Sequence, residues 1–463
     1  MNKITVDFNK TVGTIKPMNA VNNGPKVPLD PSVGQNTGNF QDYKALEIPY
    51  ARNHDAAHCM GYGGEHIVDI HCIFPDFDAD VNDPASYDFE LTDKYVETIE
   101  LTGTKNFYRL GESIEFRVKK YAICVPKDFQ KWAEICEHII RHYNEGWADG
   151  FHYGIEYWEI WNEANGDMME EGVCRRTWAG TPEEFFELYT VAATHLKKCF
   201  PDIKIGGPAI NTIHDAVWLG GHYKHHEKWA EDFFKYISER KAPLDFFSWH
   251  CYTYEPEIMV EACKKADMYL KKYGYENAES ILNEWNYVTD FSNDEWLYSL
   301  ETETNMKGAA FSIACMLACQ NTPLDMLMYY DARIGCGMNG LFHMVTLNPM
   351  KLYYGFKMFA RLRRLKNQLD LKCEGENIYA LGAKDGDEAG FIVTYYAEDR
   401  TGLPNKTVEM EFEGASGTQF EFYILDENRD GAIVKKEFSG TDKTTLYFDM
   451  EQNTVLYIRA KKM

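Results

Sequence analysis

The chain has 463 residues, a formal net charge of −24 at pH 7 and a hydrophobic fraction of 45%. This length suits two or three domains, or one large barrel with a smaller domain, and the apolar fraction allows a large core. A strongly acidic chain repels phosphate backbones, so we expect no nucleic-acid partner. Because no run of about 18 apolar residues occurs, we expect no membrane span.

The first residues and the cysteines favour a reducing compartment. Residues 1–13 lack the apolar segment of a secretory signal. The 12 cysteines are scattered, and Cys315 and Cys319 lie four residues apart on an apolar helical stretch. We therefore expect buried free thiols and a cytoplasmic location, whereas the sequence leaves open whether the chain forms a homo-oligomer.

Residues 1–14 contain a strand-like segment, which we expect to join the sheet of a β domain formed by the end of the chain. From about residue 15 to 365, short apolar runs alternate with amphipathic helical stretches, which is typical of a parallel sheet covered by helices. Thr181, Pro182 and Glu184 illustrate one helix start, with an N-cap, a first-turn proline and a capping-box acid.

Eight candidate strands occur between residues 15 and 365. They are residues 14–23, 48–55, 105–113, 155–163, 203–211, 244–254, 280–287 and 325–333. Eight such strands with helices between them predict a (β/α)8 TIM barrel, whose functional residues follow the carboxyl ends of the strands. An open doubly wound sheet is the main alternative, but the sequence lacks a glycine-rich phosphate loop.

Residues 366–463 have a different sequence pattern, with short strands of alternating polarity separated by Gly, Asp and Asn turns. This pattern predicts an all-β accessory domain, which we expect to be a β-sandwich. The predicted organisation is therefore an α/β barrel over residues 15–365 and a β domain over residues 366–463.

Two predicted barrel strands run directly into a glutamate: Glu163 ends the fourth and Glu284 ends the seventh. Glycoside cleavage uses one carboxylic acid to protonate the leaving oxygen and one carboxylate to attack the anomeric carbon or activate water. We therefore predict that both side chains face one pocket. Asn162 and Glu163 are consecutive, so both reach that pocket only if the strand ends or bulges there.

Other strand ends carry polar residues that can contact a sugar. Arg52 is interpreted either as a cation near the nucleophile or as part of a salt bridge at the barrel bottom. His54 and Asp55 can hydrogen-bond sugar hydroxyls, as can Asn162. No helix signal supports His54 and His58 as metal ligands, and we expect neither a metal nor a cofactor.

His250 and Tyr252 end the sixth predicted strand, next to the strand that carries Glu284. A hydroxyl or imidazole there can hydrogen-bond the Glu284 carboxylate and keep it ionised, although a core histidine and a packing tyrosine are the alternative. Tyr330 and Asp331 end the eighth strand, where they either line the pocket or pack within the fold.

The segments WEIWNEAN (158–165) and ILNEWNY (281–287) resemble the glutamate signatures of clan A glycoside hydrolases, and glycoside hydrolase family 39 is the more similar family. This family includes β-xylosidases and α-L-iduronidases. The resemblance spans roughly residues 15–365 and implies Glu163 as the acid/base and Glu284 as the nucleophile. The chain has Ala164 where proline is common and Tyr287 where a small residue is common, so substrate identity is less constrained than mechanism.

The resemblance implies a retaining, β-xylosidase-like hydrolase that removes terminal sugars from short oligosaccharides through a covalent glycosyl-enzyme. An α-L-iduronidase-like enzyme, or an α-L-arabinosidase or other pentosidase, would use the same pair. A non-catalytic carbohydrate-binding protein is the alternative from another class. The sequence leaves the sugar, the linkage and exo versus endo action open.

Overall fold

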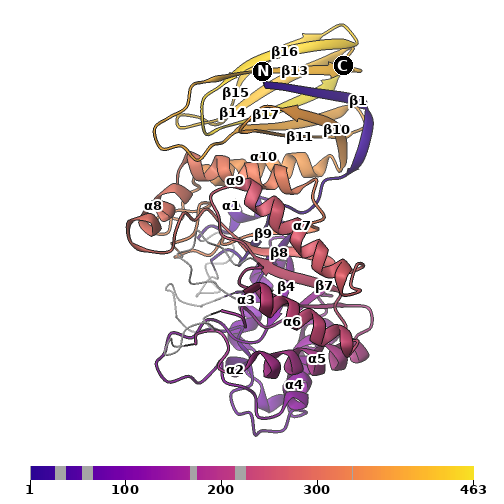
Figure 1. Ribbon diagram of the computed structural model, residues 1–463, viewed down its shortest axis with the longest axis vertical. Coiled ribbons are helices and arrows are strands. Elements are labelled where there is room, and N and C mark those ends of the chain that lie inside the picture. Colours follow the sequence, from indigo (N-terminus) through magenta and orange to yellow (C-terminus); the bar gives the residue numbers. More distant parts are fainter. Residues whose placement is uncertain (1, 27–37, 55–65, 167–174, 214–225, 336) are drawn as a thin grey trace.

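The computed structural model describes residues 2–26, 38–54, 66–166, 175–213, 226–335 and 337–463. A closed barrel of eight parallel strands forms one part, and a nine-stranded sheet forms the other. Figure 1 shows the sheet at one end of the molecule and the barrel at the other, with helix α10 (Lys351–Arg364) between them.

The barrel strands follow one another around the barrel in chain order, and β2 pairs with β9 to close it. They are β2 (Ala20–Asn22), β3 (Tyr50–Arg52), β4 (Lys105–Leu110), β5 (Tyr157–Ile160), β6 (Lys204–Ile210), β7 (Phe246–His250), β8 (Glu279–Trp285) and β9 (Met326–Tyr329). Each overlaps one of the eight strands expected from the sequence. The predicted (β/α)8 barrel is therefore confirmed.

Helices of the described residues surround the barrel. They are α1 (Phe40–Lys44), α2 (Ile70–Ile73), α3 (Glu90–Glu100), α4 (Phe129–Glu145), α5 (Pro182–Cys199), α6 (His226–Glu239), α7 (Pro256–Lys272), α8 (Asn293–Glu303) and α9 (Met306–Cys319), with short 3-10 turns at Pro84–Ser86 and Trp147–Asp149. Helix α5 begins as the sequence predicts. Thr181 and Glu184 form a reciprocal capping box, and Pro182 occupies the first turn, so the exposed backbone donors at this end are satisfied.

Inward-facing side chains fill the barrel in layers. One buried apolar cluster consists of Ala20, Phe107, Tyr157, Phe246, Ile281, Met326 and Met328. Two residues further along three of the same strands lie Asn22, Glu159 and Asn283, all fully buried. Because strand side chains alternate with a period of two, this polar layer lies directly between the apolar layer and the carboxyl ends of the strands.

The second part is a sheet in the order β15-β14-β17-β12-β11-β10-β1-β13-β16. Its strands are β1 (Asn2–Thr14), β10 (Asn367–Glu374), β11 (Ile378–Asp385), β12 (Glu388–Tyr395), β13 (Lys406–Glu413), β14 (Thr418–Leu425), β15 (Asp430–Ser439), β16 (Lys443–Met450) and β17 (Thr454–Lys462). Strand β1 pairs with β10 and β13. The rings of Phe412 on β13 and Phe420 on β14 lie with their centroids 4.9 Å apart, so the two halves of the sheet fold over a shared core.

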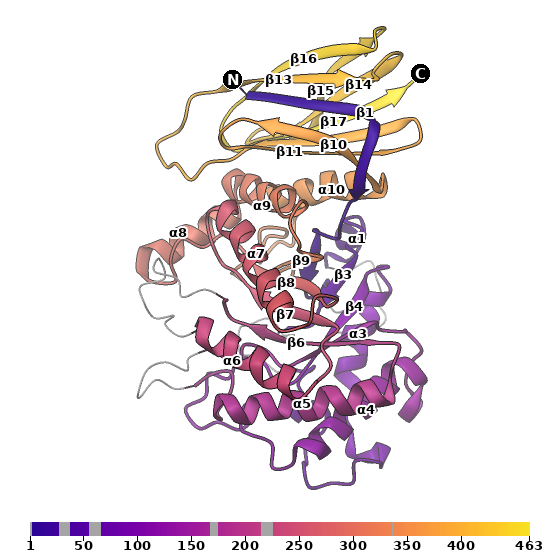
Figure 2. The ribbon, with the colours of Figure 1, turned by 45° about the vertical axis from the view of Figure 1, so that its right-hand side comes forward.

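The sheet packs on the barrel through α9 and α10, as Figure 2 shows from a second direction. Buried residues of both parts belong to one continuous apolar cluster, which includes Phe311 of α9, Phe356 of α10 and Ile392 of β12. Polar contacts cross the same interface, because the Tyr287 hydroxyl donates to Glu398 Oε2 at 2.7 Å. Tyr287 is fully buried, and this hydrogen bond links it to the segment that follows β12 of the sheet.

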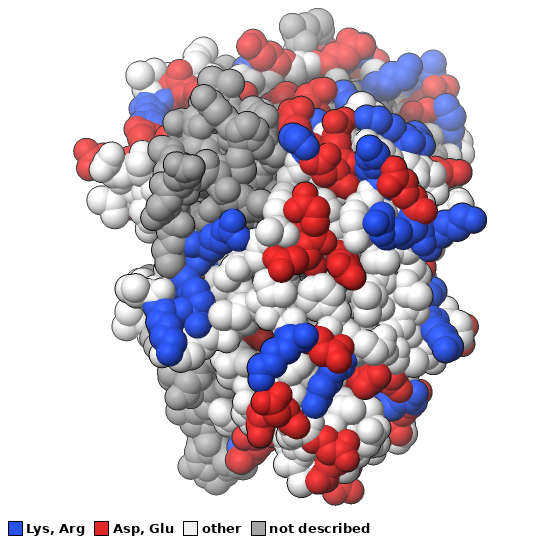
Figure 3. All heavy atoms as spheres, turned by 60° about the horizontal axis from the view of Figure 1, so that its bottom comes forward, with Lys and Arg blue, Asp and Glu red and all other residues white. Residues whose placement is uncertain are grey.

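Acidic and basic side chains are interspersed on the barrel end shown in Figure 3. Surface ion pairs of the barrel include Lys94 with Glu90 and Lys127 with Asp78. Among the helices of the described ranges, none combines the length and the apolar composition that crossing a bilayer requires.

Candidate active site

Glu163 reaches the barrel mouth because β5 ends before it. The last β5 residue is Ile160, and Trp161 and Glu163 then adopt positive φ angles of 70° and 50°. The Trp161 indole donates to Thr177 O at 2.8 Å, which holds this turn in place. Positive φ is unusual for such residues, and here it brings the consecutive side chains of Asn162 and Glu163 to the same site.

Glu284 enters the same space because β8 is irregular. The pairing register shifts between Trp249 and His250 on the β7 side and between Leu282 and Trp285 on the β9 side. Asn283 donates to a carboxylate inside the barrel at 2.5 Å, and the following Glu284 side chain also lies inside. A register shift of this kind re-aims a side chain that regular alternation would direct outward.

The two glutamates form a close pair. One carboxylate oxygen of Glu163, one of Glu284 and a ring nitrogen of His250 all lie within 4.8 Å of one another. Only 7% of Glu163 and 3% of Glu284 is exposed to solvent. His250 Nδ1 lies 2.7 Å from Glu163 Oε1 and 3.5 Å from Glu284 Oε2, and Asn211 Nδ2 donates to Glu163 Oε1 at 2.8 Å.

Arg52 connects the polar groups beneath this pair. Its Nη1 donates to Glu284 Oε1 at 2.7 Å, its Nε to Glu159 Oε2 at 2.6 Å and its Nη2 to Asn162 Oδ1 at 2.7 Å. The side chain is fully buried. Arg52 is therefore the cation beside Glu284, and its salt bridge with Glu159 lies near the carboxyl ends of the strands and not at the barrel bottom.

The environment of Glu284 raises its pKa. Burial is the main cause and the neighbouring Glu163 carboxylate adds to it, whereas Arg52 and the Tyr252 hydroxyl act to lower the pKa, and the net result is a pKa of about 7. Tyr252 donates to Glu284 Oε2 at 2.9 Å. Burial also lowers the pKa of His250 to about 4, so this imidazole is neutral at neutral pH. A neutral imidazole can hydrogen-bond Glu163 in either protonation state of that carboxyl group.

The remaining predicted site residues occupy the same end of the barrel. His54 Nε2 lies 3.4 Å from Glu284 Oε1, and the His54 ring lies 5.6 Å from the ring of Tyr330. Asp55 lies outside the described residues. Asp331 is buried and accepts hydrogen bonds from the backbone of Arg333 and, at 3.4 Å, from Asn23.

Glu159 and Asn211 are among the residues of this network that were not singled out from the sequence. Glu159 lies inside an aromatic strand, where a lone acid between Tyr157 and Trp161 signals an inward-facing charge by its period-two spacing. Asn211 follows directly after β6 and donates to Glu163. The sequence places Asn211 at the end of a predicted strand, and this position could have marked it as a candidate site residue.

With this geometry established, comparison with known proteins places the chain in a family. The model of glycosyl hydrolases family 39 matches residues 64–319, a range that is more than half of the chain and contains both glutamates. The chain belongs to glycosyl hydrolases family 39. The resemblance of the two glutamate motifs to family 39 is thereby confirmed.

Curated relatives of this family 39 chain carry the name beta-xylosidase. One from Geobacillus stearothermophilus is 29% identical over 185 residues, covering 36% of this chain and 31% of the relative. One from Caldicellulosiruptor saccharolyticus is 22% identical over 356 residues, covering 71% of this chain and 68% of the relative. The chain thus matches less than a third of the length of the first of these relatives.

The fold is also shared with solved structures. A glucosidase from Croceicoccus marinus aligns with a TM-score of 0.78 and 19% identity, covering 100% of this chain and 99% of the other. At this identity the likeness concerns the fold, including the combination of barrel and β-sheet domain.

Proposed function

We propose that the protein is a retaining glycoside hydrolase that removes terminal sugars from short oligosaccharides, with a β-xylosidase-like specificity. The observation that carries this proposal is the buried pair Glu163 and Glu284, in which one carboxylate oxygen of each residue lies within 4.8 Å of the other. Retaining enzymes place two carboxyl groups about 5–5.5 Å apart, whereas inverting enzymes leave room for a water between them. Membership of family 39 and the names of its curated relatives support the same reaction.

In this mechanism the Glu284 carboxylate attacks the anomeric carbon, and Glu163 donates its proton to the departing oxygen. Glu163 then takes a proton from the water that releases the sugar from Glu284. The charged hydrogen bond from Arg52 and the neutral one from Tyr252 favour the ionised form of Glu284. Glu163 hydrogen-bonds the neutral groups His250 and Asn211, which suits the carboxyl group that holds the proton.

The surroundings of the pair favour a neutral sugar over a uronic acid. Arg52 already donates to two carboxylates, and Arg109 donates to Asp69 and Ser113. Arg52 is therefore engaged within the protein, and Nη2 of Arg109 already has two partners. An α-L-iduronidase-like enzyme would need a cation free to bind the substrate carboxylate, while an α-L-arabinosidase or other pentosidase would not.

A panel of nitrophenyl glycosides, with NMR of the anomer released first, tests the reaction and the sugar. We expect the β-xyloside to be cleaved fastest and the released sugar to keep its β configuration. Preferential cleavage of the iduronide or arabinoside would select an alternative substrate, and initial release of the inverted anomer would reject the retaining mechanism. A sugar that binds and survives for hours would favour a carbohydrate-binding protein instead.

Variants assign the two roles. Glu284→Ala should abolish turnover, because no covalent route remains. Glu163→Ala should lose about 10²–10⁴-fold in rate on unactivated substrates, and added azide should restore cleavage of an activated aryl glycoside. Normal turnover by Glu284→Ala, or no effect of azide on Glu163→Ala, would contradict the assignment.

A further inference from the structure

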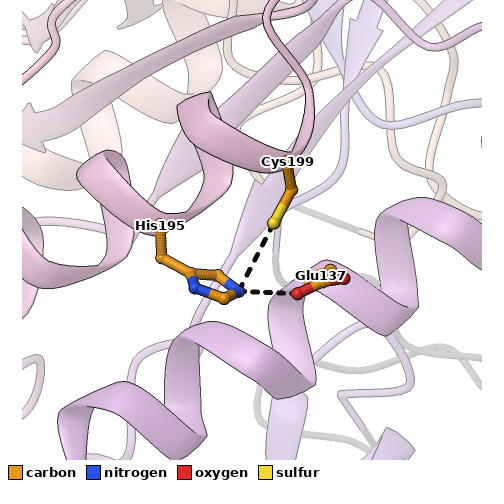
Figure 4. A group of neighbouring side chains, drawn as sticks. All are labelled: Glu137, His195 and Cys199. Atoms are coloured by element: carbon orange, nitrogen blue, oxygen red, sulfur yellow. Dashed lines mark hydrogen bonds and ion pairs between the residues drawn. The ribbon is translucent and has the colours of Figure 1, made fainter.

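Helices α4 and α5 carry three metal-ligating side chains that face one another. Glu137 comes from α4, and His195 and Cys199 lie four residues apart on α5, so both project from the same side of that helix. Figure 4 shows the three side chains converging, and one potential ligand atom from each lies within 4.8 Å of the others. All three are partly buried.

Both partners of His195 approach the same ring nitrogen. Glu137 Oε2 lies 2.6 Å from His195 Nε2, and Cys199 Sγ lies 3.7 Å from that same atom. A catalytic relay requires the thiol and the carboxylate to contact opposite nitrogens of the imidazole. Here the opposite nitrogen, Nδ1, lies 3.0 Å from the side-chain amide of Gln130. The arrangement is that of ligands around a common centre.

From this convergence we infer that Glu137, His195 and Cys199 form a binding site for a divalent cation of the zinc type. One thiolate, one imidazole and one carboxylate are ligands that Zn²⁺ accepts, and water can supply the fourth position of a tetrahedron at a partly exposed site. In such a tetrahedron the nitrogen and sulfur ligands stand roughly 3.5 Å apart. The sulfur–nitrogen distance of 3.7 Å already fits. The carboxylate has to move roughly 0.7 Å away from the imidazole.

Neighbouring side chains hold the ligands in position. Arg141 Nε donates to Glu137 Oε1 at 2.8 Å, which leaves Oε2 directed at the site. Gln130 Nε2 lies 3.0 Å from His195 Nδ1, and rotation of this side-chain amide by 180° would present its oxygen to the proton that Nδ1 carries when Nε2 binds a metal. Binding also converts the Cys199 thiol to a thiolate and releases its proton to solvent. Burial raises the pKa of this thiol, so binding should strengthen as the pH rises.

Two other groups of potential metal ligands in the described part of the chain have comparable distances between their ligand atoms. In both groups, however, the side chains already serve other interactions or a proposed catalytic role. Asp69, His71 and Glu112 form one, and Asp69 already accepts hydrogen bonds from Arg109 and Ser113 on its two oxygens. The other consists of the proposed catalytic pair and its histidine.

The position of the site points to a role in stability. Cys199 is the last residue of α5 and precedes β6, which starts at Lys204, so it lies near the amino ends of the strands. Glu163 and Glu284 lie at the opposite, carboxyl ends. Helices α4 and α5 lie side by side at the end of the barrel farthest from the sheet (Figures 1 and 2), and a bound cation would join them.

Titration of the full chain with Co²⁺ tests the site, because a cobalt–thiolate bond gives a charge-transfer absorption band that carboxylate and imidazole do not. We expect the band to appear with one equivalent and to disappear when Zn²⁺ displaces Co²⁺. Zn²⁺ at about 100 times its Kd should raise the apparent Tm by roughly 2–3 °C and leave kcat unchanged. No band and no Tm change in the wild-type protein would overturn the proposal.

Variants locate the site. Cys199→Ser should remove the band, and His195→Gln or Glu137→Gln should weaken binding by more than the roughly 10–100-fold that loss of an outer partner costs. Cys124→Ser and His152→Gln are matched controls, since both residues are exposed elsewhere on the barrel, and both should bind like the wild type. A band that survives in Cys199→Ser, or vanishes in Cys124→Ser, would place the metal elsewhere. Thermal unfolding without metal checks that each variant is folded.

Discussion

Arg52 is a single buried cation with two carboxylates in contact, Glu159 and Glu284. Removing one member of a buried ion network leaves the others desolvated without a partner, which costs more than the net contribution of the network. The two acids are not equivalent. Glu159 lies in the polar layer inside the barrel with no exposed surface, whereas Glu284 faces the pocket.

Glu159→Ala should therefore destabilise the fold strongly. It leaves Arg52 and Asn283 without their shared acceptor, and we expect the free energy of unfolding to fall by about 3–5 kcal/mol. Denaturant unfolding measures this difference. Glu284→Gln is the control, because Arg52 keeps Glu159. It should lose activity while remaining close to wild type in stability, and equal destabilisation by both variants would contradict this view.

Tyr252→Phe should change the pH profile. The hydroxyl favours the ionised form of Glu284, so its removal raises a pKa that is already about 7. If Glu284 must be ionised to attack, the acidic limb of kcat/KM reports this pKa and should move to higher pH by about 1 unit, since a hydrogen bond to a charged group contributes about 1.5–3 kcal/mol. An unchanged acidic limb, or one that moves to lower pH, would show that another group controls it.

At the scale of elements, the end of β4 positions the turn that presents Glu163. Gly111 follows β4 with a φ of 123°, and a Cβ placed there would lie 3.0 Å from Trp161 Cα and 2.9 Å from its ring. Trp161 N also donates to Leu110 O at 2.6 Å. The turn after β5 thus depends on close backbone approach to the neighbouring strand, which a glycine allows.

Gly111→Ala should displace Trp161 and with it Glu163, lowering both Tm and kcat. Gly103→Ala is a matched control, because Gly103 also has a positive φ, of 86°, but a Cβ there meets no atom within 4 Å. Both variants share a backbone cost of about 1 kcal/mol, and Gly111→Ala adds about 1–3 kcal/mol for overpacking. Thermal unfolding measures the loss of stability in each variant, so the difference between the two variants gives the overpacking cost. Aryl glycoside kinetics measure the loss of kcat. Full activity in Gly111→Ala would show that the turn tolerates the added methyl group.

At the scale of the molecule, the barrel and the nine-stranded sheet share one apolar core, and polar contacts cross it next to the pocket. Tyr287, three residues after Glu284, and Lys307 of α9 both donate to Glu398, which follows β12. We propose that residues 366–463, with residues 1–14, form an accessory domain whose packing holds the loop after β8. This gives Tyr287 a structural role where the sequence suggested an effect on substrate choice.

Glu398→Gln tests this role. The change leaves the largely buried Lys307 ammonium without its carboxylate, so the free energy of unfolding should fall by about 1–3 kcal/mol. Glu413→Gln is the control, because its partner Lys443 is 3.9 Å away and both are exposed, so the effect should lie within about 0.5 kcal/mol. Equal stability of the two variants in denaturant unfolding would argue against a coupling contact.

The sequence by itself determined the barrel, because alternating apolar strands and amphipathic helices are local patterns that repeat along the chain. It also predicted that Glu163 and Glu284 lie at the ends of strands, and parallel strands in a barrel place their carboxyl ends at one face. The same two segments carry the resemblance to family 39, and the family match over residues 64–319 confirms it.

Only the tertiary structure decided how the side chains meet. Trp161 and Glu163 have positive φ angles, and β8 has register shifts. Both features depend on packing against neighbouring strands, so no local sequence pattern predicts them. The same holds for Arg52, whose partners Glu159 and Glu284 lie more than a hundred residues away in the chain. The cluster of Glu137 with His195 and Cys199 likewise exists because two helices pack together. Contacts between distant segments depend on three-dimensional packing, which residue spacing does not encode.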